Sequence, residues 1–337
     1  MKSKKTCGRG HIAKYTFNDI LGKSAKIKAA IEKARRFGSV NATVLIYGET
    51  GVGKEIFAQA IHNVSPRKDG PFITVNCAAM PDNLLESELF GYAEGAFTGA
   101  KKGGKQGLFA MANKGTIFLD EISEMSDKLQ TRLLRVLQEY EIMPLGDDRI
   151  ITVDVRVVAA TNSNLETLVE NKHFRSDLYY RINVLTLVVP TLRERREDIP
   201  VLIEHFLGVY NKRFGKNIKG IEPKGIALFD TYAWPGNIRE IQNIMKRLVI
   251  LTDNDYISAD LVAESLMYSS MKPDIISTAQ PHKTAAENNN GNPLEYQKAI
   301  IINALKATKG NKKKAAQLLG ISRTTLWRRQ KKYNIKI

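Results

Sequence analysis

A glycine-rich loop between an apolar stretch and a helix-like stretch is the strongest constraint on how this chain of 337 residues folds. Thr43–Tyr47 is apolar and strand-like, Gly48-Glu-Thr-Gly-Val-Gly-Lys54 follows it, and residues 54–62 have helical periodicity. This order is typical of a P-loop, in which loop N–H groups and a helix N-terminus bind phosphate oxygens and the lysine reaches the β- and γ-phosphates. The predicted nucleotide ligands are Gly48, Glu49, Thr50, Gly51, Val52, Gly53, Lys54 and Glu55.

Two adjacent carboxylates end another apolar stretch, Gly115-Thr-Ile-Phe-Leu-Asp120-Glu121. They matter because Glu55 stands where most P-loops place the Ser or Thr that binds magnesium, so the metal must be held elsewhere or through water. Asp120 can bind Mg²⁺ beside the phosphates, and Glu121 can polarise an attacking water. The alternative is a strand end capped by acids that take no part in catalysis.

Apolar stretches alternate with helix-like stretches as far as Pro190. Most are apolar at nearly every position, as in strands covered by helices on both faces, and the alternation indicates a parallel α/β sheet. Beyond Pro190 the periodicity is helical, for example at Ile241, Met245 and Leu248, and residues 191–266 contain no convincing strand. The predicted strands are Thr43–Tyr47, Phe72–Asn76, Thr116–Leu119, Val153–Val158 and Leu185–Val189.

Further polar residues stand near the predicted sheet. Asn76 and Asn162 follow predicted strands, and ligands of parallel sheets bind beyond the carboxyl ends of the strands. Each alone is more often a turn residue. Arg175 and Arg181 lie six residues apart, and an arginine from a neighbouring subunit often neutralises transition-state charge on a γ-phosphate, which would make this ATPase an oligomer. The alternative is that both form surface ion pairs.

The positive charge of the chain is concentrated at its C-terminal end. The formal net charge is +16, of which Lys298–Ile337, with twelve Lys or Arg and no Asp or Glu, holds +12 and the rest of the chain +4. Such a segment is the electrostatic footprint of nucleic-acid binding. Residues 1–17 are predicted to form a basic arm, and residues 267–293, rich in Ser, Thr, Pro and Asn, a flexible linker.

Residues 294–337 have the pattern of a helix-turn-helix. Ala316 and Leu319 lie on one face of a short helix, Gly320 supplies the turn, and Ser322 is a good N-cap for the next helix. The second helix of this motif enters the major groove of DNA. The alternative is a basic helical hairpin that contacts protein. The residues expected at DNA are Lys312, Lys313, Lys314, Ser322, Arg323, Thr324, Thr325, Arg328 and Arg329.

The chain lacks the usual signals of membrane or secreted proteins. No apolar run approaches the roughly 18 residues of a membrane span, and no apolar segment follows the basic N-terminus. Its two cysteines, Cys7 and Cys77, make neither a disulfide framework nor a zinc site. We therefore expect a cytoplasmic protein without a membrane partner.

Together with Gly95-Ala-Phe-Thr-Gly-Ala100, these motifs resemble the bacterial enhancer-binding proteins, which are the AAA+ activators of sigma-54 RNA polymerase. Glu55 is normal in the P-loop of that family. The resemblance implies an α/β fold with a P-loop AAA+ parallel sheet, a helical lid subdomain and a small all-α helix-turn-helix domain of Fis-like type. It implies ATP and Mg²⁺ as cofactors. The corresponding ranges are residues 18–190 for the sheet, 191–266 for the lid and 294–337 for the DNA-binding domain.

The resemblance also implies a role for each candidate residue. Asp120 and Glu121 become the acidic pair at the nucleotide, with Asp120 on magnesium and Asn76 as a switch residue facing Glu121. Asn162 becomes the first sensor of the nucleotide. Further roles are those of Arg175 and Arg181 as arginine fingers for a neighbouring subunit, and of Arg239, in Trp234-Pro-Gly-Asn-Ile-Arg239-Glu, as the second sensor.

The six residues Gly95, Ala96, Phe97, Thr98, Gly99 and Ala100 form the loop that contacts sigma-54 in that family. Glycines at both ends leave the backbone free to move, Phe97 is the only large apolar group, and Thr98 adds a hydrogen-bonding tip. The implied partners are sigma-54 RNA polymerase holoenzyme, upstream double-stranded DNA, and further copies of the chain in a ring, a hexamer in the family, with dimers formed through the C-terminal domain.

Two other functions are compatible with an ATPase joined to a DNA-binding end. Another DNA-bound AAA+ machine, such as a replication initiator or helicase loader, would not be expected to carry the 95–100 loop. A regulator that senses nucleotide without turnover would not need Asp120, Glu121 and both finger arginines.

Overall fold

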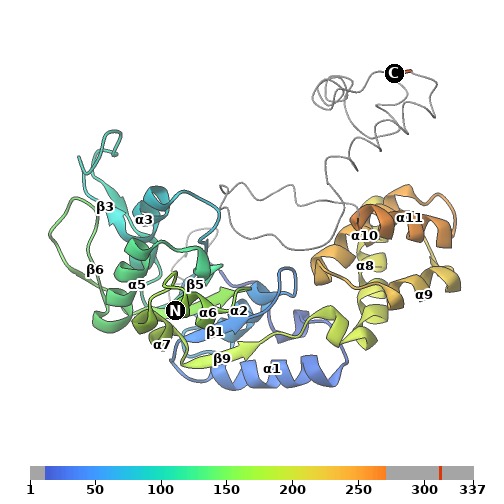
Figure 1. The fold of residues 1–337 in the computed structure, drawn as a ribbon, viewed down its shortest axis with the longest axis horizontal. Helices are drawn as coiled ribbons and strands as arrows, with labels where there is room; N and C mark the ends of the chain where they lie inside the picture. Colours follow the sequence, from blue (N-terminus) through green and yellow to red (C-terminus); the bar gives the residue numbers. More distant parts are fainter. Residues whose placement is uncertain (1–11, 271–310, 313–337) are drawn as a thin grey trace, which may run out of the picture. The chain divides into compact units, whose positions relative to one another are not determined.

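The computed structural model describes residues 12–270 and 311–312. Within 12–270 the chain folds as a sheet subdomain followed by a helical one (Figure 1). No helix in the described ranges combines the length and the apolar character needed to cross a membrane.

A five-stranded sheet is the framework of the first subdomain, with strand order β2-β5-β8-β1-β9 and every neighbouring pair parallel. This confirms the predicted parallel α/β sheet. Because all strands run the same way, the residues that follow them meet at one edge of the sheet. The strands are β1 Val44–Tyr47, β2 Phe72–Asn76, β5 Thr116–Asp120, β8 Arg156–Thr161 and β9 Leu185–Val188.

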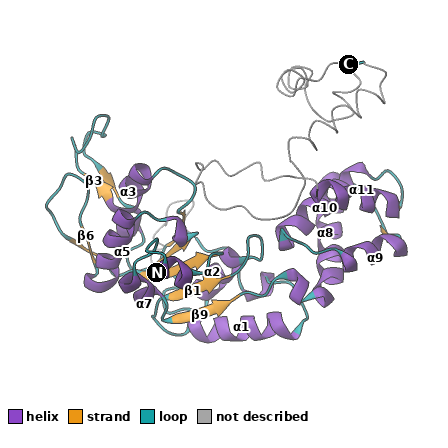
Figure 2. Ribbon diagram, viewed as in Figure 1, coloured by secondary structure: helices purple, strands orange, loops and turns teal. Residues whose placement is uncertain are grey.

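Helices cover both faces of this sheet, as Figure 2 shows. On β1, Val44 and Ile46 pack in one hydrophobic core, while Leu45 packs in the other. Both faces are therefore buried, which explains the nearly continuous apolar strands. Helices α1 (Ala25–Gly38) and α2 (Lys54–Asn63) contribute to the first core. The second core contains residues of α3 (Asp82–Phe90), α4 (Leu108–Met111), α5 (Asp127–Glu139), α6 (Leu165–Glu170) and α7 (Ser176–Ile182).

One predicted strand was placed too early in the sequence. The prediction was Val153–Val158, whereas β8 begins at Arg156 and continues to Thr161. Val153 instead donates its N–H to the Tyr140 carbonyl, and the Asp154 N–H is bound by the Asn113 side chain. These contacts make residues 153–155 a connection into the sheet although they alternate like a strand.

Two loops extend beside the sheet subdomain, near the labels β3 and β6 in Figure 1. The first joins the antiparallel pair β3 (Gly91–Tyr92) and β4 (Lys105–Gln106), and it contains the 95–100 segment. The second joins β6 (Glu141–Ile142) and β7 (Ile151–Thr152). A bridge between Tyr92 and Leu145 connects the two loops at their bases.

The lid subdomain is helical, as predicted, around a core that contains Trp234, Ile241, Met245 and Leu248. The prediction of no strand was wrong, because β10 (Gly220–Ile221) and β11 (Tyr256–Ile257) form a parallel pair. Each is only two residues long, which is too short to give a periodic pattern. The helices are η3 Leu192–Glu194, η4 Arg196–Asp198, α8 Ile199–Phe214, α9 Pro223–Thr231, α10 Asn237–Leu251 and α11 Ala259–Ser270, the last continuing past residue 266.

The end of the predicted basic arm lies against α2. The Gln59 side chain accepts hydrogen bonds from the N–H groups of Lys14 and Tyr15, and Asn63 donates to the Tyr15 carbonyl. A short helix, η1 (Phe17–Asp19), follows, and its Phe17 is buried in the first core.

Candidate nucleotide-binding site

The predicted P-loop lies between β1 and α2, at the carboxyl edge of the sheet. In the described part of the chain, the N–H groups of Gly53, Lys54 and Glu55 donate to no backbone carbonyl. They lie at the N-terminus of α2, where the helix dipole also favours an anion. The buried Lys54 side chain donates from Nζ to the Gly48 carbonyl at 2.8 Å, across the loop. This arrangement can bind a phosphate group.

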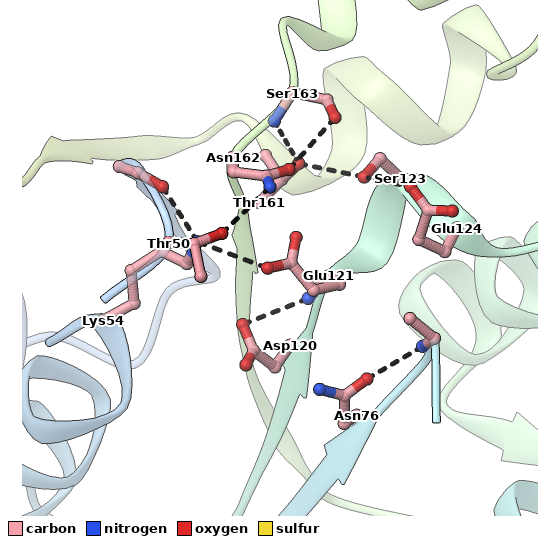
Figure 3. A network of polar contacts seen from close by, with 12 residues as sticks. Thr50, Lys54, Asn76, Asp120, Glu121, Ser123, Glu124, Thr161, Asn162 and Ser163 are labelled. Atoms are coloured by element: carbon pink, nitrogen blue, oxygen red, sulfur yellow. Dashed lines mark hydrogen bonds and ion pairs between the residues drawn. The ribbon is translucent and has the colours of Figure 1, made fainter. Parts of the chain in front are cut away.

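Asp120 and Glu121 lie opposite the P-loop (Figure 3). Asp120 ends β5, and Glu121 follows with a φ of +52° and places its carboxylate 3.6 Å from Lys54 Nζ. Burial raises the pKa of Asp120, and the neighbouring Glu121 carboxylate raises it further, while the Lys54 ammonium opposes both effects. Two neighbouring carboxylates beside one lysine carry an excess of negative charge, which favours the binding of a cation.

Magnesium fits this pair only with help from other ligands. The described residues contain no group of three or more His, Cys, Asp or Glu side chains that could hold a metal ion. Mg²⁺ is commonly bound through one or two carboxylates and completed by waters and substrate phosphates. Asp120 beside an open phosphate site meets that requirement.

The structure brings Asn162 to the P-loop. Its Nδ2 donates to Thr50 Oγ1 at 3.3 Å, and its Oδ1 accepts from Ser163 Oγ (Figure 3). Asn76 lies on β2 in register with Asp120, and its side chain accepts from the Ala78 N–H at 2.9 Å. No hydrogen bond within the described residues joins Asn76 to Glu121, whose carboxylate lies near Lys54 instead.

Arg175 and Arg181 bind elsewhere than at the P-loop of their own chain. Arg175 forms a forked pair with Asp177, with Nε 3.0 Å from Oδ1 and Nη2 2.6 Å from Oδ2. Arg181, on α7, donates from Nε and Nη2 to the Leu137 carbonyl at the end of α5. Both arginines are exposed.

The lid meets the P-loop directly. The Arg239 N–H, in the first turn of α10, points to the Gly51 carbonyl at 3.3 Å. Glu49 lies in a pair with Arg193 of η3 and accepts from Asn237 of α10. Sequence reasoning missed Arg193 and Asn237, because their partner lies well over a hundred residues earlier in the chain.

A cavity of about 390 Å³ beside the P-loop was also missed. Its walls are mostly apolar, as is usual for a site that binds a small molecule. The available signal was the group of apolar residues Phe17, Ile20 and Leu21 at and directly after the end of the predicted arm. The cavity is lined by Tyr15, Asn18, Asp19, Ile20, Leu21, Val52, Gly53, Ile56, Phe57, Leu202, His205, Phe206, Ile238 and Gln242.

The 95–100 loop is largely exposed, and Ala96 lies close to Gly146 of the loop between β6 and β7. A Cβ atom at either Gly95 or Gly99 would meet nothing within 4 Å. Phe97 is 46% exposed, as predicted for the loop's apolar group, and its ring packs edge-on against Tyr92 with centroids 4.9 Å apart. Of the residues expected at DNA, Lys312 is described and exposed, and the others lie outside the described residues.

Family models match three consecutive segments of the chain. They are the Sigma-54 interaction domain over residues 20–188, the AAA+ ATPase lid domain over 193–275, and the bacterial regulatory protein, Fis family, over 295–333. The order agrees with the resemblance inferred from the motifs.

Characterised relatives cover most of the chain. The signal-transduction and transcriptional-control protein of Clostridium beijerinckii is 44% identical over 96% of this chain and 50% of its own length. The transcriptional regulatory protein ZraR of Escherichia coli (strain K12) is 45% identical over 91% of this chain and 67% of its own length. This chain therefore spans one half to two thirds of these relatives.

A solved structure gives the same fold. NtrX from Brucella abortus, in complex with ATP, is 30% identical and superposes with a TM-score of 0.69 over 94% of this chain and 69% of its own. The chain belongs to the family of sigma-54-dependent transcriptional activators, with an AAA+ P-loop ATPase domain, its lid and a Fis-type helix-turn-helix domain.

Proposed function

We propose that this protein hydrolyses ATP and uses the energy to remodel the closed complex of sigma-54 RNA polymerase through its 95–100 loop, while bound to DNA upstream. The observation that carries the proposal is one subdomain with two features. A phosphate site faces an acidic pair, and an exposed loop on the same sheet subdomain bears an aromatic residue that is nearly half exposed. Nucleotide binding alone would not require that loop.

The residues at the site divide the work of hydrolysis. Lys54 and the N–H groups at the start of α2 would bind the phosphates, and Asp120 would hold Mg²⁺, which supplies charge neutralisation to phosphoryl transfer. Glu121, held near Lys54, would orient and polarise the attacking water, and Asn162 would register the γ-phosphate through its contact with Thr50. The apolar cavity beside the P-loop would receive the adenine base.

Turnover would need a second subunit. Arg175 and Arg181 contact Asp177 and the Leu137 carbonyl, not the P-loop of their own chain. Because both arginines are exposed, a neighbouring subunit's nucleotide could come within their reach. A ring, a hexamer in this family, would place one subunit's arginines beside the next subunit's phosphates. Dimers formed through residues 294–337 would bind double-stranded DNA. The protein, the DNA and the polymerase would meet in the cytoplasm.

The decisive experiment is ATP hydrolysis measured against protein concentration, with and without sigma-54 holoenzyme on a supercoiled promoter. We expect turnover to rise steeply with concentration and open complexes to form only with hydrolysable ATP. Hydrolysis without open complexes would favour another DNA-bound AAA+ machine. Nucleotide binding without hydrolysis at any concentration would favour a nucleotide-sensing regulator.

Two variants separate the assigned parts within that assay. Thr98→Ala should retain hydrolysis and lose open-complex formation, because it alters only the exposed loop. Arg175→Ala should still bind ATP, because its own P-loop is intact. It should lose hydrolysis, because the neighbouring subunit's phosphates lose the arginine that would neutralise their charge. Normal turnover in Arg175→Ala would remove the finger assignment.

A further inference from the structure

One of the contacts between the lid and the P-loop is made by a buried side-chain amide, that of Asn237. Asn237 is fully buried, and its side chain uses all of its hydrogen-bonding groups in three directions. Nδ2 donates to Glu49 Oε2 and to the Thr50 carbonyl, both at 3.1 Å, and Oδ1 accepts from the Leu192 N–H at 2.8 Å. The residue therefore connects the P-loop with two elements of the lid, η3 and α10.

The surrounding backbone is built for close approach at this point. Gly51 has a φ of +82°, and a Cβ atom there would lie 2.3 Å from the Gly236 carbonyl oxygen. The Gly51 carbonyl accepts from the Ile238 N–H at 3.0 Å. Asn237 itself has a φ of +51°, a conformation that Asn tolerates better than most residues with a side chain.

Glu49 adds a charged arm to the same contact. Arg193, in η3, holds its carboxylate in a forked pair, which lowers the pKa of Glu49. Glu49 thus accepts from both Arg193 and Asn237, and the three residues form one polar unit, here called the lid clamp. Because Asn237 is buried, an amide group left without its hydrogen-bond partner would destabilise this arrangement.

The lid clamp lies beside the cavity described above, whose walls come from both subdomains. Val52, Gly53 and Ile56 line it from the P-loop side, and Ile238 and Gln242 line it from α10. Ile238 is the residue directly after Asn237. The width of the cavity therefore depends on where the clamp holds the start of α10.

We propose that Asn237 and Glu49, with Arg193, are positioning residues that hold the lid against the P-loop at the spacing a nucleoside triphosphate requires, and that they set nucleotide affinity rather than the rate of the chemical step. The inference rests on the proposed ATPase function and adds residues to which the motifs assigned either no role or only that of a loop ligand. None of the three replaces Lys54, Asp120 or Glu121 in the chemistry.

Asn237→Asp tests the proposal with almost no change in shape. The new carboxylate keeps the bond from Leu192 but faces the Glu49 carboxylate and the Thr50 carbonyl without a proton to donate. We expect the Kd of the full chain for a fluorescent ATP analogue with Mg²⁺ to rise by about tenfold to a hundredfold. The KM for ATP should rise in parallel, while kcat at saturating ATP changes less than threefold.

Rescue by a second change separates the clamp from a general effect on folding. In Glu49→Gln/Asn237→Asp, the new amide at position 49 can donate to the new carboxylate at position 237, so Kd should fall about tenfold below that of Asn237→Asp. Asn217→Asp, the same change at an exposed lid residue, should leave Kd unchanged. Arg193→Met, at a half-exposed position where folding is not at risk, should raise Kd about threefold to tenfold.

Each outcome decides the proposal. It is overturned if Asn237→Asp and Arg193→Met bind the analogue like the wild type, or if the double variant binds no better than Asn237→Asp. It is also overturned if kcat falls at an unchanged Kd. A wild-type chain that neither binds nor hydrolyses ATP would defeat the ATPase function as well, whereas a normal wild type with normal variants would defeat the clamp alone.

Discussion

The P-loop and the 95–100 loop are both rich in glycine, but their glycines serve different ends. Gly51 and Gly95 have nearly the same φ, +82° and +78°. At Gly51 a Cβ atom would collide with the Gly236 carbonyl, whereas at Gly95 it would meet open space. The first glycine is required by its neighbours, and the second only by its own backbone.

This difference indicates how each loop can work. The P-loop is held by the lid clamp, by Lys54 across its mouth and by the helix that follows, so it presents its N–H groups in one geometry. The 95–100 loop is attached at its base by the Tyr92–Leu145 bridge, and near its tip the ring of Phe97 rests on Tyr92. A rigid site can bind phosphate with little loss of entropy, and a lightly held loop can move when the nucleotide changes.

The largest expected effect separates the two loops by chemistry. Glu121→Gln removes the carboxylate that would polarise water but keeps its size, so we expect ATP hydrolysis to fall by about 10²–10⁴-fold. Binding of the ATP analogue should change only a few-fold, because Lys54 and the open N–H groups remain. Phosphate release and analogue titration on the same preparation measure both. A turnover within tenfold of the wild type would show that another group activates the water.

Gly51→Ala tests the claim that the P-loop is fixed by its neighbours. The methyl group meets the Gly236 carbonyl oxygen, and an alanine at positive φ is itself strained, so the free energy of unfolding should fall by about 2–4 kcal/mol. Nucleotide affinity should fall with it, because the lid must move away from the loop. Urea denaturation and analogue binding measure the two losses. Wild-type stability would mean that the lid is not held as closely as the distances indicate.

The fold and the chemistry of the site could be predicted where one short segment contains the whole signal. Thr43–Lys54 combines strand, loop and helix, and Asp120-Glu121 directly follows an apolar strand, so their meeting at one sheet edge follows from parallel topology. The contact between Asn237 and Glu49 could not be predicted, because nothing near either residue indicates a partner so distant in the sequence.

Errors in the predicted elements have a similar physical cause. Val153 and Val155 alternate with polar residues as in a strand, but the bonds from the Val153 N–H to Tyr140 and from the Asp154 N–H to Asn113 place this segment outside the sheet. The 95–100 loop was correctly predicted to expose Phe97, but its contact with Tyr92 depends on a loop conformation that periodicity does not describe. Local patterns specify elements, while contacts between elements specify the details of the site.

A smaller effect concerns the helix that carries the P-loop. Burial, with the nearby Arg156 cation, lowers the pKa of His62 on α2 to about 4, so this histidine is neutral in the folded protein near neutral pH. The unfolded chain takes up a proton near pH 6.5, so stability is lost as the pH falls from about 6.5 towards 4. Between pH 7.5 and pH 5 this loss should be about 2 kcal/mol.

His62→Gln isolates that contribution, because glutamine can still bond to Thr116 but does not titrate. Urea denaturation at the two pH values should show a smaller acid-induced loss of stability in the variant, by the same amount of about 2 kcal/mol. Equal losses in the two proteins would mean that His62 is not buried in its neutral form. Burial of a neutral His62 would then not contribute to the stability of α2.

Gly95→Ala should have the smallest effect on stability and is the direct counterpart of Gly51→Ala. The added methyl group meets no atom within 4 Å, so only the strain of positive φ remains, about 1 kcal/mol, and it falls on a loop that can relax. ATP affinity and hydrolysis should match the wild type, while open-complex formation should slow, because the loop is stiffer. If Gly95→Ala instead weakens nucleotide binding as much as Gly51→Ala does, the 95–100 loop is coupled to the phosphate site even in the absence of polymerase, and the two glycine-rich loops form one mechanical unit.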